Sequence, residues 1–166
     1  MNVIEIDHLT YSYPGAEQPT LKDITVKIKK GDFLAIVGNN GCGKSTFCKT
    51  LNGLIPQFIS GDFQGSVRAC DLDTRETDVG TLARKVGYVF QDSDSQLFMS
   101  TVFEDVAFAP RNYGLPETEV EQRVSHALEQ IHIGHLRDKQ IYKLSGGEKN
   151  PLKAYLASYT LITQLK

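Results

Sequence analysis

The stretch FLAIVGNNGCGKST, residues 33–46, decides the fold predicted for this chain. It begins with a short apolar run, Phe33 to Val37, whose β-favouring residues predict a buried parallel strand. Residues 38–45 then fit the pattern G-x-x-x-x-G-K-[ST], and helix-compatible residues follow from Thr46 to Leu54. A strand, a loop and a helix therefore follow one another in the order that a phosphate-binding loop requires. The sequence predicts a nucleotide-binding site here.

The residue types of this loop match the chemistry of a triphosphate. Glycines let backbone N–H groups turn inward around phosphate oxygens, and the start of the helix adds partial positive charge. The Lys44 ammonium is expected on the β- and γ-phosphates, and the Ser45 hydroxyl on Mg²⁺. We interpret Cys42, in the same loop, as a small filler residue. The alternative is a Gly-rich turn that precedes a helix by chance.

Composition is that of an ordinary globular domain. The chain has 166 residues, 40% hydrophobic and 23% charged, enough for one domain with its own core. A net charge of -2 argues against nucleic acid as the main partner. Neither a membrane span nor a signal peptide is apparent, and the three cysteines form no disulfide or zinc pattern. These features together predict a cytoplasmic protein.

Apolar periodicity and turn residues predict the remaining elements. Gln91 directly follows a second apolar run and ends it. Strands are predicted at Val3–Tyr13, Leu21–Lys29, Ser66–Ala69 and Val86–Phe90, helices at Val79–Lys85, Thr101–Ala109 (ended by Pro110) and Glu117–Ile131, and a surface loop at 53–65.

Two further sites have alternative interpretations. The LSGGE motif, Leu144 to Glu148, precedes a helical stretch and fits either a helix cap or a second anion site. Tyr13 fits either a core aromatic residue or a platform for an adenine ring, and composition alone favours the core.

Taken together, these residues resemble the ATP-binding subunit of ABC transporters. Four pieces occur in family order: Tyr13, GNNGCGKST at 38–46, Gln91, and LSGGE at 144–148. The stretch from Val89 to Leu115 is similar to the ATPase subunits of energy-coupling-factor (ECF) importers of vitamins and metal ions, including cobalt-type ones.

The resemblance implies an α/β P-loop NTPase fold. It has a RecA-like core, an antiparallel β subdomain and an inserted helical subdomain, with the C-terminal part missing. Residues 1–166 would be a single ABC-type domain. The core and antiparallel part would span 1–54 and 66–91, the helical and signature part 92–148, and an atypical tail 149–166.

ATP and Mg²⁺ are the implied cofactors. Tyr13 would stack on adenine, the loop would clamp the phosphates, and Ser45 and Gln91 would hold Mg²⁺. Lys44 and Gln91 would be the catalytic residues. The implied cofactor-binding residues are Tyr13, Gly38, Asn39, Asn40, Gly41, Cys42, Gly43, Lys44, Ser45, Thr46, Ser145, Gly146 and Gly147.

The resemblance also implies partners. The signature residues would complete the γ-phosphate site of a second ABC ATPase subunit in a head-to-tail homodimer or heterodimer. Membrane-embedded transporter subunits would place the protein on the inner face of the cell membrane, and no nucleic-acid partner is expected. A soluble ABC ATPase that acts on DNA or ribosomes is a competing hypothesis.

The C-terminal residues depart from the family pattern. An apolar strand that ends in an Asp-Glu pair should follow the signature helix, yet Tyr155–Lys166 contains no Asp or Glu. We therefore expect a chain truncated before that strand, and a module that binds ATP without hydrolysis stays an alternative to an ATPase. Asn150 as N-cap and Pro151 as first helical residue predict a new helix, with an apolar stripe of Leu152, Tyr155, Leu156, Tyr159 and Ile162.

Overall fold

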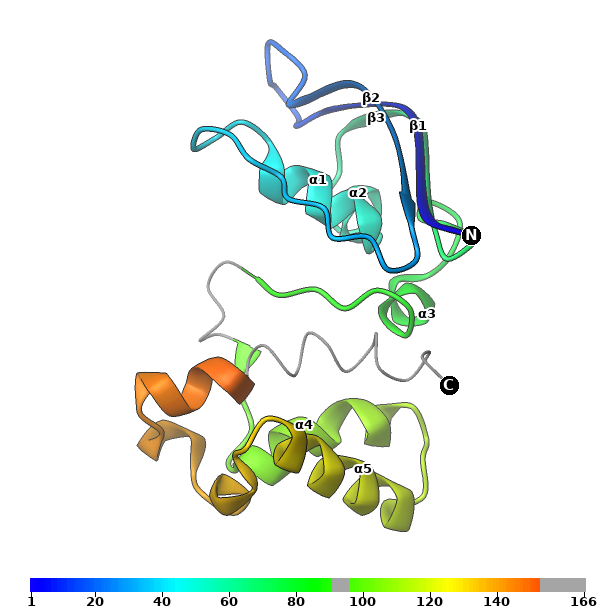
Figure 1. Ribbon diagram of the computed structural model, residues 1–166. Helices are drawn as coiled ribbons and strands as arrows, with labels where there is room; N and C mark the ends of the chain where they lie inside the picture. Colours follow the sequence, from blue (N-terminus) through cyan, green and yellow to red (C-terminus); the bar gives the residue numbers. More distant parts are fainter. Residues whose placement is uncertain (91–95, 153–166) are drawn as a thin grey trace. The chain divides into compact units, whose positions relative to one another are not determined.

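The computed structural model describes residues 1–90 and 96–152. The chain divides into two compact units, Met1–Tyr88, here called the N-terminal unit, and Val89–Lys166, here called the helical unit (Figure 1). Gln91, and the stripe predicted from Tyr155 to Ile162, lie outside the described residues. No helix among residues 1–90 and 96–152 has the length and apolar character needed to cross a membrane.

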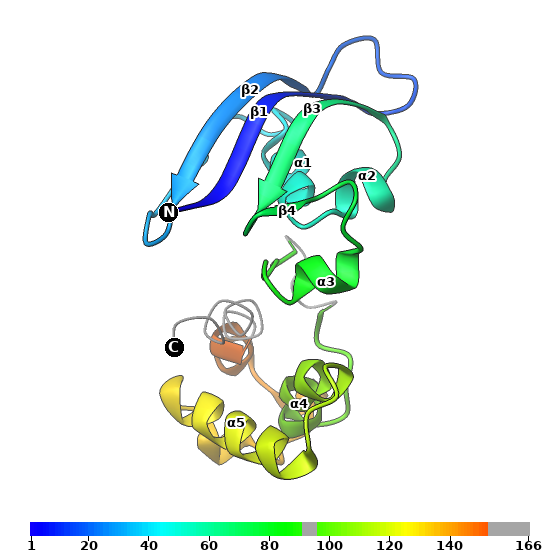
Figure 2. The ribbon, with the colours of Figure 1, turned by 90° about the vertical axis from the view of Figure 1, so that its right-hand side faces the viewer.

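An antiparallel sheet in the order β2-β1-β3-β4 is the frame of the N-terminal unit (Figure 2). The central strand β1 (Asn2–Ser12) pairs with β2 (Leu21–Lys29) and β3 (Asp62–Ala69), and β4 (Leu72–Asp73) is a short edge. The predicted strands at β1 and β2 are confirmed. The predicted 53–65 loop is too long, because it contains a short helix, α2 (Leu54–Gln57), and the first residues of β3.

A break in the regular strand pattern of β1 places its core residues. His8 has a φ of 49°, and the pairing register shifts between Ile6 and Leu9. Such a bulge lets Ile6 and Leu9, three positions apart, both lie buried. Helix α1 (Lys44–Leu51) and α2 contribute to the same core (Figure 1). The buried core residues are Ile6, Leu9, Tyr11, Leu21, Phe47, Ile55 and Val67.

The two predicted apolar strands do not form. Residues 33–37 and 86–90 have no strand assignment, and Phe33 and Val37 are 96% and 87% exposed. A buried parallel strand needs neighbouring strands, and no segment within residues 1–90 and 96–152 pairs with either run. The prediction of buried strands at Phe33–Val37 and Val86–Phe90 is therefore wrong for this structure.

Helices build the rest of the described chain. The predicted helices correspond to α3 (Val79–Ala83), α4 (Val102–Asn112) and α5 (Glu117–Gln130). The prediction that Pro110 ends its helix is wrong, since α4 continues to Asn112. Pro110 lies in the last turn and is buried, so it removes one donor near the helix end while its ring packs in the core.

Short 3₁₀ turns, η2 (Gly134–Leu136) and η3 (Ile141–Lys143), connect α5 to the LSGGE motif. Helix follows over residues 146–152, through Asn150 and Pro151. The prediction of a new helix starting at Asn150 is therefore wrong, because the helix already begins at Gly146, four residues before Asn150, and is capped by Ser145. The core of the helical unit consists of Val102, Val106, Ala107, Val120, Val124, Ala127, Leu128, Ile133, Leu136, Ile141, Leu144 and Leu152.

Candidate nucleotide-binding site

Two glycines of the phosphate loop have a positive φ and little room for a side chain. Gly43 has a φ of 96°, and a Cβ there would lie 2.8 Å from the Thr20 carbonyl oxygen. Gly38 has a φ of 156°, and its Cβ would lie 2.7 Å from the Cys42 Sγ. A side chain at either position would collide with its surroundings and strain the backbone. The path of the loop therefore requires glycine at Gly43, where the contact is with backbone, while at Gly38 the positive φ favours glycine and the contact is with a side chain.

The start of α1 offers a row of free backbone donors. The first helical hydrogen bond runs from the Phe47 N–H to the Gly43 carbonyl, at 2.8 Å. In the described part of the chain, the four preceding N–H groups, from Gly43 to Thr46, donate to no acceptor. Unpaired donors at the positive end of a helix dipole are the usual components of an anion site.

The Lys44 side chain lies back across the loop. Its Nζ donates to the carbonyls of Gly38 and Asn39 at 2.8 and 2.7 Å, and lies 3.7 Å from the Cys42 Sγ. Among the described residues no carboxylate pairs with it, so the ammonium contacts two backbone carbonyls and a cysteine sulfur. Its positive charge thus stays available for an anion at the loop.

Tyr13 lies beside the same helix. Its hydroxyl is 3.0 Å from the Thr46 hydroxyl, and its ring meets the Tyr11 ring edge-on, with centroids 5.1 Å apart. Sequence reasoning had named Thr46 as a loop residue but missed this bond, because 33 positions separate the two residues. The structure therefore brings Tyr13 together with the loop residues from Gly38 to Thr46, all within the N-terminal unit.

Ser45 is exposed, and its hydroxyl makes no hydrogen bond within the described residues. Its hydroxyl is therefore free to bind a cation. No group of three His, Cys, Asp or Glu side chains among residues 1–90 and 96–152 is arranged to hold a metal. A magnesium ion at Ser45 would thus take its other ligands from phosphate, water or residues outside this set.

The LSGGE motif forms a helix cap in the helical unit. Ser145 donates through its N–H and its hydroxyl to one Glu148 carboxylate oxygen, both at 2.7 Å, and the Glu148 N–H donates back to the Ser145 Oγ at 3.4 Å. This is the reciprocal arrangement of a capping box. The cap interpretation of the motif is thus confirmed.

Lys139, which sequence reasoning missed, stabilises the cap from outside the motif. Its Nζ donates to the other Glu148 oxygen at 2.7 Å. This ammonium, followed by the bonds from Ser145, lowers the pKa of Glu148 to about 2. No sequence pattern marks Lys139, because the contact depends on how the preceding turn folds back.

Gly146 and Gly147 are both exposed, and a Cβ added at either meets nothing within 4 Å. The described residues therefore place no steric requirement on them. They lie in the helical unit, whereas the phosphate loop lies in the N-terminal unit.

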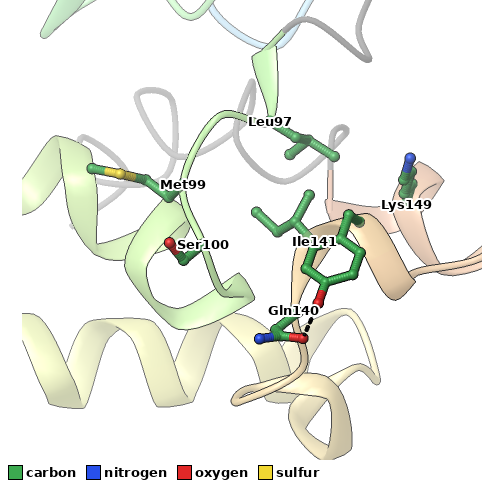
Figure 3. A pocket seen from close by; sticks show the side chains of 7 residues that line it. Leu97, Met99, Ser100, Gln140, Ile141 and Lys149 are labelled. Atoms are coloured by element: carbon green, nitrogen blue, oxygen red, sulfur yellow. Dashed lines mark hydrogen bonds between the residues drawn. The ribbon is translucent and has the colours of Figure 1, made fainter.

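A groove of about 380 Å³ lies elsewhere on the helical unit (Figure 3). Leu97, Met99 and Ile141 give it apolar walls, and Tyr142 donates a 2.6 Å hydrogen bond to Gln140 at its margin. Asp105, 5% exposed, accepts from the Phe98 and Met99 N–H groups at 3.1 and 3.0 Å. Burial raises the pKa of this carboxyl, while the two bonds act in the opposite direction. The segment that forms one wall is thus anchored to α4.

Comparison with known proteins shows which family this chain is similar to. The family model described as ABC transporter matches residues 21–161. A Pyrococcus abyssi protein named as an ABC transporter ATP-binding protein is 46% identical over 152 residues, which are 92% of this chain and 54% of that protein. The energy-coupling factor transporter ATP-binding protein EcfA1 of Lacticaseibacillus paracasei is 42% identical over 149 residues, 89% of this chain and 51% of that protein.

Among solved structures, cbiO1 from Clostridium perfringens, part of the ABC transporter complex cbiONQ, matches with a TM-score of 0.81. The two are 33% identical, and the match covers 96% of this chain and 62% of that one. The predicted P-loop fold with an antiparallel sheet and a helical part is thus confirmed. The chain spans about half the length of the two relatives.

Proposed function

The chain belongs to the ABC transporter family, and on that premise we propose that it is the ATP-binding part of an ECF-type importer ATPase. ATP binding and hydrolysis would drive import of a vitamin or a metal ion through membrane subunits. Its place would be the cytoplasmic face of the membrane. The resemblance to EcfA1 and to cbiO1 supports the ECF type.

The phosphate loop is the observation that carries this proposal. Four free N–H groups at the start of α1 and an ammonium without a carboxylate partner in the described chain match the charge and donor needs of a triphosphate. When ATP binds, Lys44 would exchange its contacts with the Gly38 and Asn39 carbonyls for phosphate oxygens. Because those carbonyls are neutral, little Coulomb attraction opposes the exchange.

Mg²⁺ and the adenine base of ATP would bind at the edges of the loop. The exposed Ser45 hydroxyl fits a magnesium ligand, and the resemblance adds Gln91, which lies outside the described residues. A bound Mg²⁺ would neutralise phosphate charge. Tyr13, whose hydroxyl lies 3.0 Å from that of Thr46, would hold the adenine ring near the loop.

Ser145, Gly146 and Gly147 would act on the ATP of a second subunit. Glycine at the first helical positions weakens a helix by roughly 0.5–1 kcal/mol relative to alanine. Within residues 1–90 and 96–152 nothing requires either glycine, since a Cβ at each would meet no atom within 4 Å. Close approach of a partner's phosphate would explain both, and this supports a head-to-tail dimer.

The groove lined by Leu97, Met99 and Tyr142 is the surface that we assign to the membrane subunits. It combines apolar walls with the Lys149 ammonium and is open to solvent. To test it, the chain would be co-expressed with ECF-type membrane subunits, and their co-purification measured. Tyr142→Ala is expected to reduce it, whereas Phe58→Ala, in the other unit, is the matched control because both rings are 74% exposed.

The first experiment measures MgATP binding and phosphate release on the same purified chain. Lys44→Ala is expected to weaken binding at least tenfold, because it removes the one side-chain cation of the loop. Lys49→Ala, in the last turn of the same helix, is the control and should leave the affinity within twofold.

Each outcome has a distinct meaning. Binding without phosphate release supports an ATP-binding module, and release that Lys44→Ala abolishes supports an ATPase. Equal binding by wild type and Lys44→Ala would contradict the proposed site. Absence of binding by the wild type would contradict the proposed function as a whole.

A further inference from the structure

The bond between Tyr13 and Thr46 connects two parts of the site that bind different parts of a nucleotide. Tyr13 follows the last residue of β1, whereas Thr46 lies in the first turn of α1. Their hydroxyls are 3.0 Å apart, and Thr46 is only 6% exposed. The Thr46 N–H is one of the four free donors at the loop. The aromatic ring is therefore tied to the same helical turn that offers those donors.

A second contact limits where the Tyr13 ring can move. The Tyr11 ring meets it edge-on at an interplanar angle of 81°, and the Tyr11 hydroxyl is itself fixed by donation to the Ser60 carbonyl at 2.9 Å. The Tyr13 side chain is therefore held at two points: Tyr11 packs against its ring, and Thr46 bonds its hydroxyl. A ring that is already placed loses less conformational freedom when a base stacks on it.

From this geometry we infer that the Tyr13–Thr46 hydrogen bond is a positioning bond that sets the spacing between the base platform and the phosphate loop. The inference rests on the proposed function. It assigns a role to the two hydroxyls beyond stacking and beyond phosphate binding. The measurable consequence concerns the base only: the bond should increase the affinity for ATP relative to a triphosphate without a base.

The experiment compares the dissociation constants of MgATP and of inorganic tripolyphosphate with Mg²⁺. The ratio of the tripolyphosphate constant to the ATP constant, here called the ATP advantage, isolates what the nucleoside contributes to binding. Tyr13→Phe keeps the ring and removes the hydroxyl, and Thr46→Val removes the other hydroxyl at nearly constant volume. Each is expected to reduce the ATP advantage about three- to tenfold, the range that the loss of one hydrogen bond predicts. The double variant should lose no more than either single one.

Thr50→Val is the matched control. It also removes a threonine hydroxyl hydrogen bond from α1, but that bond runs to the Phe47 carbonyl at 2.7 Å and reaches neither Tyr13 nor the loop. We expect a lower melting temperature and an unchanged ATP advantage. A general loss of stability at Tyr13 would therefore be separated from a loss of positioning.

Four results would overturn the inference. Unchanged dissociation constants for both ligands in Tyr13→Phe and Thr46→Val would show that the bond positions nothing, and additive losses in the double variant would show that the hydroxyls act independently. Equal weakening of ATP and tripolyphosphate by Tyr13→Phe would indicate support of the loop alone. If the wild type bound neither ligand, the proposed function would fail, and this inference with it.

Discussion

Gly43 in the phosphate loop and Gly147 in the LSGGE motif both lie at the start of a helix, but their surroundings are opposite. Gly43 is buried with a φ of 96°, and its Cβ would lie 2.8 Å from a carbonyl oxygen. Gly147 is exposed, and its Cβ would meet nothing within 4 Å. The sequence alone does not distinguish the two kinds of glycine.

The difference indicates where the need for each glycine arises. Gly43 is required by the path of this chain itself, because any side chain would collide with Thr20. Gly147 weakens its helix, and no described residue lies close enough to require a glycine there. The requirement would therefore come from another molecule that approaches this position. This contrast supports a phosphate site that is complete in its local geometry and a signature that acts on a partner.

The strongest test of the contrast is Gly43→Ala. A left-handed residue with a side chain costs about 1–2 kcal/mol, and the overlap with the Thr20 carbonyl adds to it. We expect a lower free energy of unfolding of the N-terminal unit and loss of ATP binding, measured by urea unfolding and by titration.

Gly15→Ala is the control for this variant. Gly15 has a φ of 76° but open space around its Cβ, so it carries the backbone strain without the collision. The difference between the two variants measures the collision alone. Equal destabilisation by both would show that crowding at Gly43 has no effect.

What the sequence could predict depended on how local each feature is. The turn that leads into α1 was predicted, because it depends mainly on the residues of the motif itself, whereas nucleotide binding there stays a prediction. The strand expected at Phe33–Val37 failed, because a parallel strand exists only beside other strands and no described segment supplies one. The Tyr13–Thr46 and Lys139–Glu148 contacts were equally unpredictable, since they join residues whose proximity only the fold creates.

A smaller effect is expected from Glu148→Gln, which tests whether the cap holds the LSGGE helix. The folded pKa of Glu148, about 2, lies below its ordinary value of 4.5. A carboxylate whose pKa is lowered by folding stabilises the fold above the unfolded pKa, and this contribution is lost as pH falls from 4.5 towards 2. The variant should therefore be less stable than the wild type at pH 6 to 7 and should converge with it near pH 2.

The measurement is thermal unfolding followed by circular dichroism across that pH range. Because Asp105 is present in both proteins, its own titration cancels in the difference. Glu129→Gln is the control, since Glu129 is exposed and the described residues give its carboxylate no hydrogen-bonded or ionic partner. A pH-independent gap between wild type and Glu148→Gln would mean that the charge of the carboxylate does not stabilise the cap.

The smallest effect on stability is expected from Gly147→Ala. Alanine favours the helix by up to about 1 kcal/mol over glycine, and the added Cβ has open space. The melting temperature should therefore stay equal or rise slightly. ATP-dependent dimerisation, followed by sedimentation, should nevertheless be lost, because the methyl group would occupy space that a partner's phosphate needs. A variant that dimerises with ATP like the wild type would remove the reason for this glycine, whereas one that unfolds like Gly43→Ala would erase the contrast between the two motifs.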